Sequence, residues 1–159
     1  MSSPFRRIGV IGAGAMGRGI AQLYAQAGVP VVVHDAQPKA LDAAFAYLHE
    51  TFDRLVEKGR MSAEQRAATL ARVTRADSLQ GFADCDLVVE AIVERLDVKR
   101  EIFKALEAVV APDAVLASNT SSLSITAIAA ACERPARVAG YHFFNPVPLM
   151  KVVEVVRGV

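Results

Sequence analysis

The sequence is poor in cysteine. Its 159 residues include only Cys85 and Cys132, which lie far apart and in no spacing typical of a metal site. So few cysteines argue against a disulfide scaffold and favour a reducing compartment. We therefore expect a cytoplasmic protein without a bound metal, in which both thiols are core or near-surface side chains.

The sequence also lacks an excess of either charge and a long hydrophobic run. Its net charge is +1, so nothing indicates nucleic acid, a membrane surface or a polyanionic partner. No apolar run approaches the roughly 18 residues of a membrane-spanning helix. The first seven residues lead directly into an apolar segment, so we expect no signal or transit peptide. The length and composition predict one globular domain over residues 1–159.

Residues 8–28, IGVIGAGAMGRGIAQLYAQAG, form the stretch around which the rest is organised. A short apolar run, a glycine-rich turn and a helix-forming segment follow one another. Gly12 lets the backbone turn sharply off the strand, and Gly14 leaves room for a pyrophosphate close to the main chain. Gly17 lets the helix pack tightly on the strand. The unpaired N–H groups of the first helical turn complete a site for an anion.

A second apolar run, residues 29–35, ends in an acid 18 residues after Gly17. Asp35 at the tip of this strand can accept hydrogen bonds from an adenosine ribose, and its charge repels a 2′-phosphate. The series therefore predicts an NAD site and disfavours NADP. The alternative is a glycine turn between a strand and a helix, with a solvated Asp beyond it.

After Asp35 the apolar spacing becomes helical. One helix is expected from about residue 39 to 58, and a second from Ser62, with Gln65 in the capping-box position, to about 72. Together they form a helical hairpin, an arm over residues 38–72 that could touch a substrate or another domain. A packed helical pair without a contact role is an equal alternative.

The remaining pattern alternates strands and helices. Strands are expected at 73–75, 86–94, 115–117, 137–144 and 151–156, with helices at 97–110 and 125–131. This order predicts an α/β fold: a doubly wound, mostly parallel Rossmann sheet with a helical-hairpin insertion and an antiparallel C-terminal strand. The last two strands must be antiparallel, because only a few residues join them.

Several polar groups fall where parallel strands end, and His142 is the best candidate for a base. If the last turn is centred near Pro148, residue 142 faces residue 154, which is Glu. A carboxylate beside the imidazole would hold one tautomer and stabilise the imidazolium. The alternative is a surface His and an outward-facing Glu on an edge hairpin.

Ser121 and Ser122 lie in a second polar cluster, residues 118–122. Either hydroxyl could donate a hydrogen bond to a substrate oxygen. The alternative is that they cap the helix that follows, a position that Ser124 fits better.

The chain resembles the NAD-binding domain of the 3-hydroxyacyl-CoA dehydrogenases. The matching segments are IGVIGAGAMGRGIAQ, VVVHDAQPKAL, DLVVEAIVERLDVKREIF, SNTSSLSIT and GYHFFNPVPLMKVVEVV, which together span nearly the whole sequence. The SNTSSL and HFFNPVPLMKVVEVV segments are much more specific than the glycine turn.

The resemblance implies oxidation of a 3-hydroxyacyl-CoA to the 3-ketoacyl-CoA with NAD, a reaction of fatty-acid β-oxidation. His142 would take the proton of the C3 hydroxyl, Glu154 would orient His142, and Ser121 and Asn145 would hold the C3 oxygen. Glu94 and Lys99 would line the nicotinamide half of the cofactor site, and the arm would contact CoA. The expected cofactor contacts are Gly12, Gly14, Ala15, Met16, Gly17, Asp35, Ala91, Glu94, Lys99, Asn119, Ser121 and Asn145.

In this family a helical domain follows, supplies dimer contacts and closes over the substrate. The sequence stops where that domain would begin. We therefore expect a partner domain, in cis or as a separate chain, a homodimer of the full-length protein, and low activity of this chain alone. Two alternatives stay open: a non-catalytic NAD-binding module, and a nicotinamide-dependent dehydrogenase of a small hydroxy acid.

Overall fold

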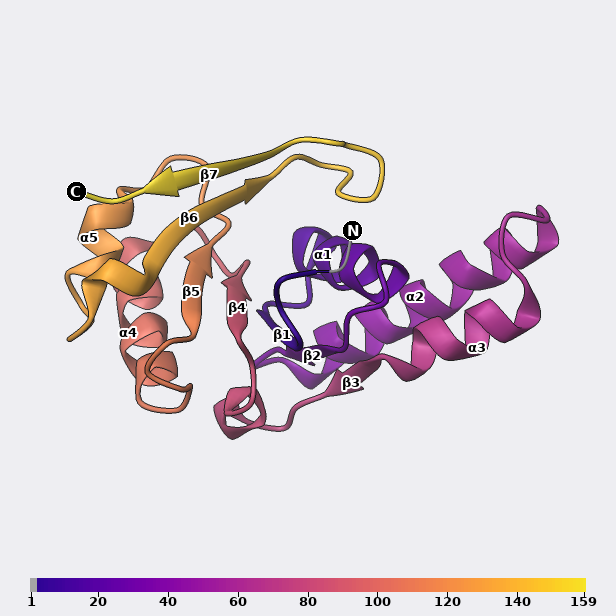
Figure 1. The fold of residues 1–159 in the computed structure, drawn as a ribbon, viewed down its shortest axis with the longest axis horizontal. Helices are drawn as coiled ribbons and strands as arrows, with labels where there is room; N and C mark the ends of the chain where they lie inside the picture. Colours follow the sequence, from indigo (N-terminus) through magenta and orange to yellow (C-terminus); the bar gives the residue numbers. More distant parts are fainter. Residues whose placement is uncertain (1–2) are drawn as a thin grey trace.

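A seven-stranded β-sheet forms the centre of the computed structural model, which describes residues 3–159 (Figure 1). The first two residues of the predicted domain lie outside the described part. The order of the strands across the sheet is β3-β2-β1-β4-β5-β6-β7. The strands are β1 (Ile8–Ile11), β2 (Val31–His34), β3 (Val73–Arg75), β4 (Leu87–Glu90), β5 (Val115–Ser118), β6 (Val138–Phe143) and β7 (Val153–Arg157).

All neighbouring strands are parallel except β6 and β7, which are antiparallel. The order reverses between β1 and β4, and a crevice at the carboxyl ends of the strands is expected at such a point. This topology confirms the predicted doubly wound sheet with its antiparallel last strand.

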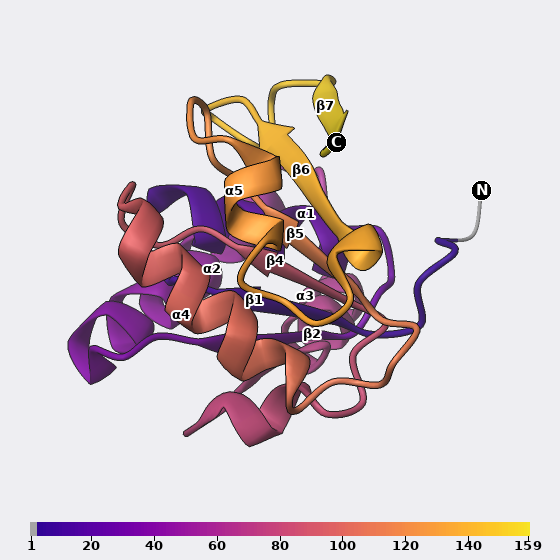
Figure 2. The ribbon, with the colours of Figure 1, turned by 90° about the vertical axis from the view of Figure 1, so that its left-hand side faces the viewer.

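Helices cover both faces of the sheet. Helices α1 and α2 pack with β1 and β2 in one apolar core, whereas α4 and α5 pack with β4 and β5 in a second. Figure 2 shows α4 and α5 on the near side of the strands. No α-helix in the described part of the chain is long and apolar enough to cross a membrane. The α-helices are α1 (Ala15–Gln26), α2 (Pro38–Glu57), α3 (Ala63–Ala71), α4 (Leu96–Glu107) and α5 (Ile125–Ala129), and 3-10 turns lie at Leu79–Phe82 and Pro135–Arg137.

Helices α2 and α3 form the predicted hairpin, which projects from the sheet (Figure 1). Gly59 turns the chain with a φ of 69°, a conformation that glycine adopts without strain. The Ser62 hydroxyl accepts the Gln65 N–H, and the Gln65 side chain accepts the Ser62 N–H. This reciprocal capping box begins α3 where the sequence predicts it.

Three predicted strands are longer than the observed ones, and β6 is shorter than predicted by one residue at each end. The strand expected over 86–94 ends at Glu90, because the buried Glu90 carboxylate accepts the Ile92 N–H and turns the chain out of the sheet. The last strand starts at Val153 rather than at 151. Before it, the N–H groups of Leu149 and Met150 both donate to the Pro146 carbonyl in a turn.

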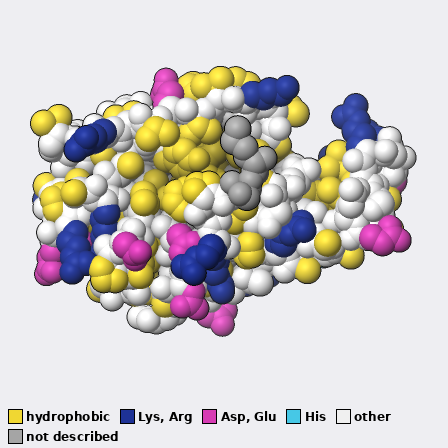
Figure 3. Space-filling model, in the orientation of Figure 1, with side chains coloured by type: hydrophobic (Ala, Val, Ile, Leu, Met, Phe, Trp, Pro, Cys, Tyr) yellow, Lys and Arg dark blue, Asp and Glu magenta, His cyan; other side chains and the backbone are white. Residues whose placement is uncertain are grey.

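One face of the sheet is only partly covered. Helices α1 and α2 cover this face over β1 to β3, but over β5 and β6 the same face is hollowed and apolar. Figure 3 shows hydrophobic side chains gathered on one side of the molecule. Val155, at its rim on the antiparallel edge strand β7, is 72% exposed. We call this surface the open apolar face: it is lined by Phe5, Leu87, Val115, Ala117, Ala139, Gly140, Tyr141 and Val155.

Candidate functional site

The glycine turn between β1 and α1 has the geometry expected of a pyrophosphate cradle. Gly12 has a φ of 102°, and an added Cβ would lie 2.4 Å from the Ala91 carbonyl oxygen. At Gly17 a Cβ would lie 1.7 Å from the Gly12 carbonyl oxygen, whereas a Cβ at Gly14 would meet nothing within 4 Å. Gly12 and Gly17 are therefore required by the fold itself, and Gly14 leaves open space.

The first turn of α1 faces that space. No side chain caps the helix at Gly14, so its first N–H groups remain free of a side-chain acceptor. Free N–H groups and the positive end of the helix dipole together favour a bound anion. Ala15 and Met16, both predicted cofactor contacts, occupy this turn.

Asp35 follows β2 and is tied to the glycine turn. Its Oδ2 accepts the Ala13 N–H at 2.7 Å and its Oδ1 accepts the Gln37 N–H at 2.8 Å. A carboxylate offers about four acceptor positions, so both oxygens can still accept from a ribose. Asp35 lines a cavity of about 470 Å³ together with Gly12, Gly14, Ala91 and Ile92.

A second cavity, of about 350 Å³, adjoins the first through Ala91 and Ile92, which line both. It gathers the catalytic candidates at the carboxyl edge of the sheet. Its walls are Met16, Ala91, Ile92, Glu94, Lys99, Asn119, Ser121, His142, Phe143, Phe144 and Asn145. We call it the His142 cavity.

His142 and Glu154 face each other across the β6–β7 ladder, as the hairpin arithmetic predicts. Nδ1 of His142 lies 3.0 Å from Oε2 of Glu154. An ionised carboxylate can only accept, so this contact places the proton on Nδ1 and leaves Nε2 as an acceptor. Phe144 packs against the imidazole with ring centroids 4.7 Å apart. The geometry therefore holds one tautomer of a half-buried imidazole at the cavity wall.

Lys99 lies at the bottom of this cavity among charged side chains, of which the sequence predicted Lys99 and Glu94 but not Glu90. Its Nζ is 2.6 Å from Oε2 of Glu90 and 3.3 Å from Oε2 of Glu94. Glu90, at the end of β4, is fully buried and also accepts the Ser118 hydroxyl at 2.6 Å. In the sequence Glu90 is only an acid that interrupts an apolar strand, and that interruption is the signal that could have identified it.

The loop after β5 presents Ser121 to the His142 cavity. The preceding Thr120 is buried and donates its hydroxyl to Glu94, and it also accepts the Leu123 N–H at 3.0 Å. Ser124, not Ser121 or Ser122, caps α5 by accepting the Ala127 N–H. The capping alternative for Ser121 and Ser122 is therefore wrong.

Hydrogen bonding also fixes two further candidates. Burial by itself raises the pKa of Glu94. The hydrogen bond from the Thr120 hydroxyl and the positive charge of Lys99 outweigh this effect, so the pKa of Glu94 lies below its ordinary value. Asn119 uses its Oδ1 to accept the Phe143 N–H at 2.9 Å, which fixes the end of β6 beside the β5 loop. Its amide nitrogen stays available to a ligand, and Asn145 also lines the cavity.

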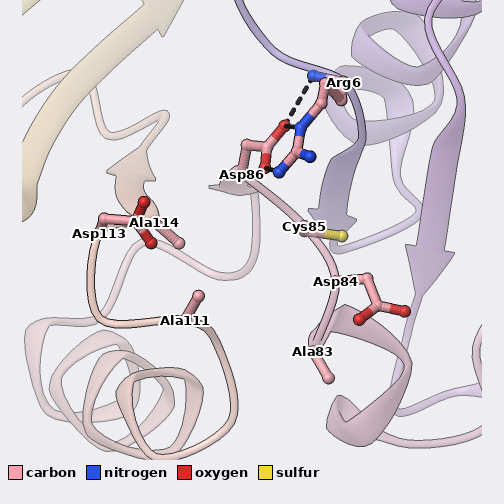
Figure 4. A pocket seen from close by; sticks show the side chains of 8 residues that line it. All are labelled: Arg6, Ala83, Asp84, Cys85, Asp86, Ala111, Asp113 and Ala114. Atoms are coloured by element: carbon pink, nitrogen blue, oxygen red, sulfur yellow. Dashed lines mark hydrogen bonds and ion pairs between the residues drawn. The ribbon is translucent and has the colours of Figure 1, made fainter.

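A third cavity, of about 470 Å³, lies at the opposite edge of the sheet, where β4 and β5 begin (Figure 4). Arg6 and Asp86 form an ion pair of 3.0 Å on its wall, and Asp84 and Asp113 add acidic groups. It lies away from the glycine turn and from His142, and we assign it no part in the site.

Comparisons with known proteins agree with this geometry. Residues 7–159 match the family model described as 3-hydroxyacyl-CoA dehydrogenase, NAD binding domain. A probable 3-hydroxybutyryl-CoA dehydrogenase of Deinococcus radiodurans is 51% identical over 96% of this chain and 54% of its own length. The crystal structure of (S)-3-hydroxybutyryl-CoA dehydrogenase PaaH1 from Ralstonia eutropha superposes with a TM-score of 0.93 at 41% identity, covering 98% of this chain and 55% of that one.

The chain thus spans about half the length of these relatives. It covers only 21% of a longer one, the fatty acid oxidation complex subunit alpha of Psychrobacter arcticus, which is 42% identical over 94% of this chain. The match to the family model extends over almost all of the sequence. The chain therefore belongs to the family of NAD-binding domains of the 3-hydroxyacyl-CoA dehydrogenases.

Proposed function

We propose that this chain is the cofactor-binding and catalytic half of an enzyme that interconverts 3-hydroxyacyl-CoA and 3-ketoacyl-CoA with NAD. The observation that carries the proposal is the His142–Glu154 pair. It stands on the wall of a cavity that adjoins the glycine-turn cavity through Ala91 and Ile92. The family is described as an NAD-binding domain, and a base on this wall would lie beside a dinucleotide bound over the glycine turn.

The residues present fit NAD. The open space at Gly14 and the uncapped start of α1 suit a pyrophosphate, and Asp35 suits an adenosine ribose without a 2′-phosphate. Met16, Glu94 and Lys99 line the part of the site next to His142. When bound, NAD supplies a hydride acceptor for C3 of the substrate.

His142 acts as the general base in the oxidation. Nε2 of His142 takes the proton of the C3 hydroxyl while the hydrogen on C3 leaves as a hydride, together with the electron pair of the C3–H bond. The positive charge that forms on the imidazole is stabilised by Glu154, 3.0 Å away on the Nδ1 side. In the reverse direction the imidazolium returns the proton to the C3 oxygen.

Ser121 and Asn145 would hold the C3 oxygen, since both line the cavity beside His142. The α2–α3 arm would contact the CoA portion. The positions of Ser121 and Asn145 in the cavity support their role, whereas the role of the arm rests on the family resemblance alone.

We further propose that a helical domain, in cis or as a separate chain, completes the enzyme, which works as a homodimer. Two findings support a missing part: the relatives are about twice as long, and the open apolar face leaves Val155 72% exposed. Exclusion of water and substrate positioning depend on such closure. The two free cysteines suit a cytoplasmic location.

The test uses this chain fused to the C-terminal half of the Deinococcus radiodurans relative. The fusion should reduce acetoacetyl-CoA with NADH, and His142→Gln should abolish this activity while the affinity for NADH stays nearly unchanged. Free acetoacetate serves as the competing substrate and should react far more slowly. Full activity of the His142→Gln fusion would show that His142 is not the base. A preference for the free acid would favour a dehydrogenase of small hydroxy acids.

A further inference from the structure

Two carboxylates share one ammonium at the bottom of the His142 cavity. Lys99 contacts Glu90 at 2.6 Å and Glu94 at 3.3 Å, and all three come from the segment that runs from the end of β4 into α4. We call these three side chains the Glu90–Lys99–Glu94 cluster. When all three are ionised, one negative charge is left without a matching cation.

The cluster is held in place from several sides. The Ser118 hydroxyl and the Ile92 N–H donate to Glu90 at 2.6 and 2.8 Å, and the Thr120 hydroxyl donates to Glu94. The side chains of Glu90 and Lys99 are 0% and 1% exposed, and that of Glu94 is 41% exposed. The charges of Glu90 and Lys99 are therefore held away from solvent, whereas Glu94 is fixed by its contacts and partly exposed.

Burial of such a group calls for an explanation beyond stability. Replacing a buried ion pair by well-packed apolar side chains is often neutral or stabilising, so the pair alone is weak evidence for a structural purpose. Lys99 and Glu94 both line the His142 cavity, where the nicotinamide half of NAD is proposed to lie. Among the described residues that line it, Lys99 is the only lysine or arginine.

The oxidised nicotinamide ring carries a positive charge that the reduced ring lacks. A fixed negative charge nearby therefore stabilises NAD⁺ and leaves NADH almost unaffected. At an effective dielectric constant of about 20, one unit charge within about 10 Å changes such a binding constant by about tenfold.

We propose that the Glu90–Lys99–Glu94 cluster sets the balance between oxidised and reduced cofactor by favouring NAD⁺ over NADH. Glu90 thereby gains a role as a positioning residue that holds Lys99 and supplies half of the negative charge. This inference rests on the NAD site of the proposed function but not on the acyl-CoA substrate.

The test compares two dissociation constants on the 159-residue chain. NADH is titrated by its fluorescence, and NAD⁺ is measured by calorimetry at the same ionic strength. In Glu94→Gln and in Glu90→Gln, the ratio Kd(NAD⁺)/Kd(NADH) should rise about tenfold over the unaltered chain. Glu94→Asp, which keeps the charge, should retain the original ratio. Glu101→Gln, which removes an exposed charge from the same helix, is the matched control and should also retain it.

A merely structural cluster gives a different result. Loosening of the cavity would weaken both cofactors alike, so equal losses with an unchanged ratio in the Gln variants would overturn the proposal. If Glu90→Gln does not fold by circular dichroism, the partly exposed Glu94→Gln decides the outcome alone. Failure of the unaltered chain to bind either cofactor would overturn the proposal together with the NAD site. Failure of the fusion to reduce acetoacetyl-CoA, with NADH still bound, would count only against the proposed reaction.

Discussion

Replacing Gly14 by alanine should separate cofactor binding from folding. Gly14 has a φ of −70°, which alanine adopts readily, and an added Cβ would meet no protein atom within 4 Å. Alanine restricts the unfolded chain and so stabilises by about 0.4–1 kcal/mol, but it is a poorer N-cap than glycine by a similar amount. The free energy of unfolding should therefore change by less than about 1 kcal/mol. The new methyl group would nevertheless occupy the space where a pyrophosphate approaches the backbone.

Gly17→Ala is the matched comparison, because it adds the same methyl group three residues later. That Cβ would lie 1.7 Å from the Gly12 carbonyl oxygen, so the turn itself must distort. Overpacking of this kind costs about 1–3 kcal/mol. Urea denaturation and NADH fluorescence titration on both variants give the two quantities. Gly14→Ala should lose at least about tenfold in NADH affinity without losing stability, whereas Gly17→Ala should lose both. Unchanged NADH affinity in Gly14→Ala would refute the assignment of the glycine turn.

Three other expectations concern stability, thiol reactivity and turnover. The carboxylate of Glu107 accepts the N–H groups of Glu133 and Arg134. Burial by itself raises the pKa of Glu107, but these hydrogen bonds outweigh it, and the net pKa is lowered. The stabilisation is therefore present above the ordinary carboxyl range and is lost as the pH falls through the lowered pKa. Glu107→Gln should therefore cost about 1–2 kcal/mol at pH 7, and the difference in unfolding free energy between variant and unaltered chain should shrink as the pH falls below the ordinary carboxyl range. A difference that stays constant with pH would contradict this. Burial raises the pKa of Cys85 and Cys132 to about 11, so both should react with a disulfide reagent at pH 8 far more slowly than free cysteine, and rapid labelling of the folded chain would count against the structure. The chain alone should bind NADH yet turn over acetoacetyl-CoA slowly or not at all, and a full rate would refute the need for a further domain.

The pairing of His142 with Glu154 was predictable because an antiparallel hairpin obeys a simple count. Once the turn is placed near Pro148, the register follows, and the structure pairs the two residues as expected. The positions of the glycine turn and of Asp35 were predictable for a similar reason, since each depends on local backbone geometry and a fixed spacing. The doubly wound, mostly parallel sheet followed from the alternation of strands and helices, but the alternation did not specify the order of the strands.

The contacts of Glu90 were not predictable from the sequence. Whether a carboxylate at the end of β4 meets Lys99 on α4 depends on how the chain turns between residues 91 and 95, and no residue pattern specifies that path. The same holds for Thr120, whose bond to Glu94 joins two loops at neighbouring strand ends. Nor does spacing reveal that Asp35 binds the Ala13 N–H and so ties the glycine turn to β2.

The most direct test of the central claim is a crystal structure of this chain with NADH bound. The account predicts that the adenosine ribose is hydrogen-bonded to Asp35 and that the nicotinamide ring enters the His142 cavity, with its C4 facing the space beside Nε2 of His142. A dinucleotide that leaves this cavity empty, or an imidazole turned away from the ring while still bound to Glu154, would contradict it.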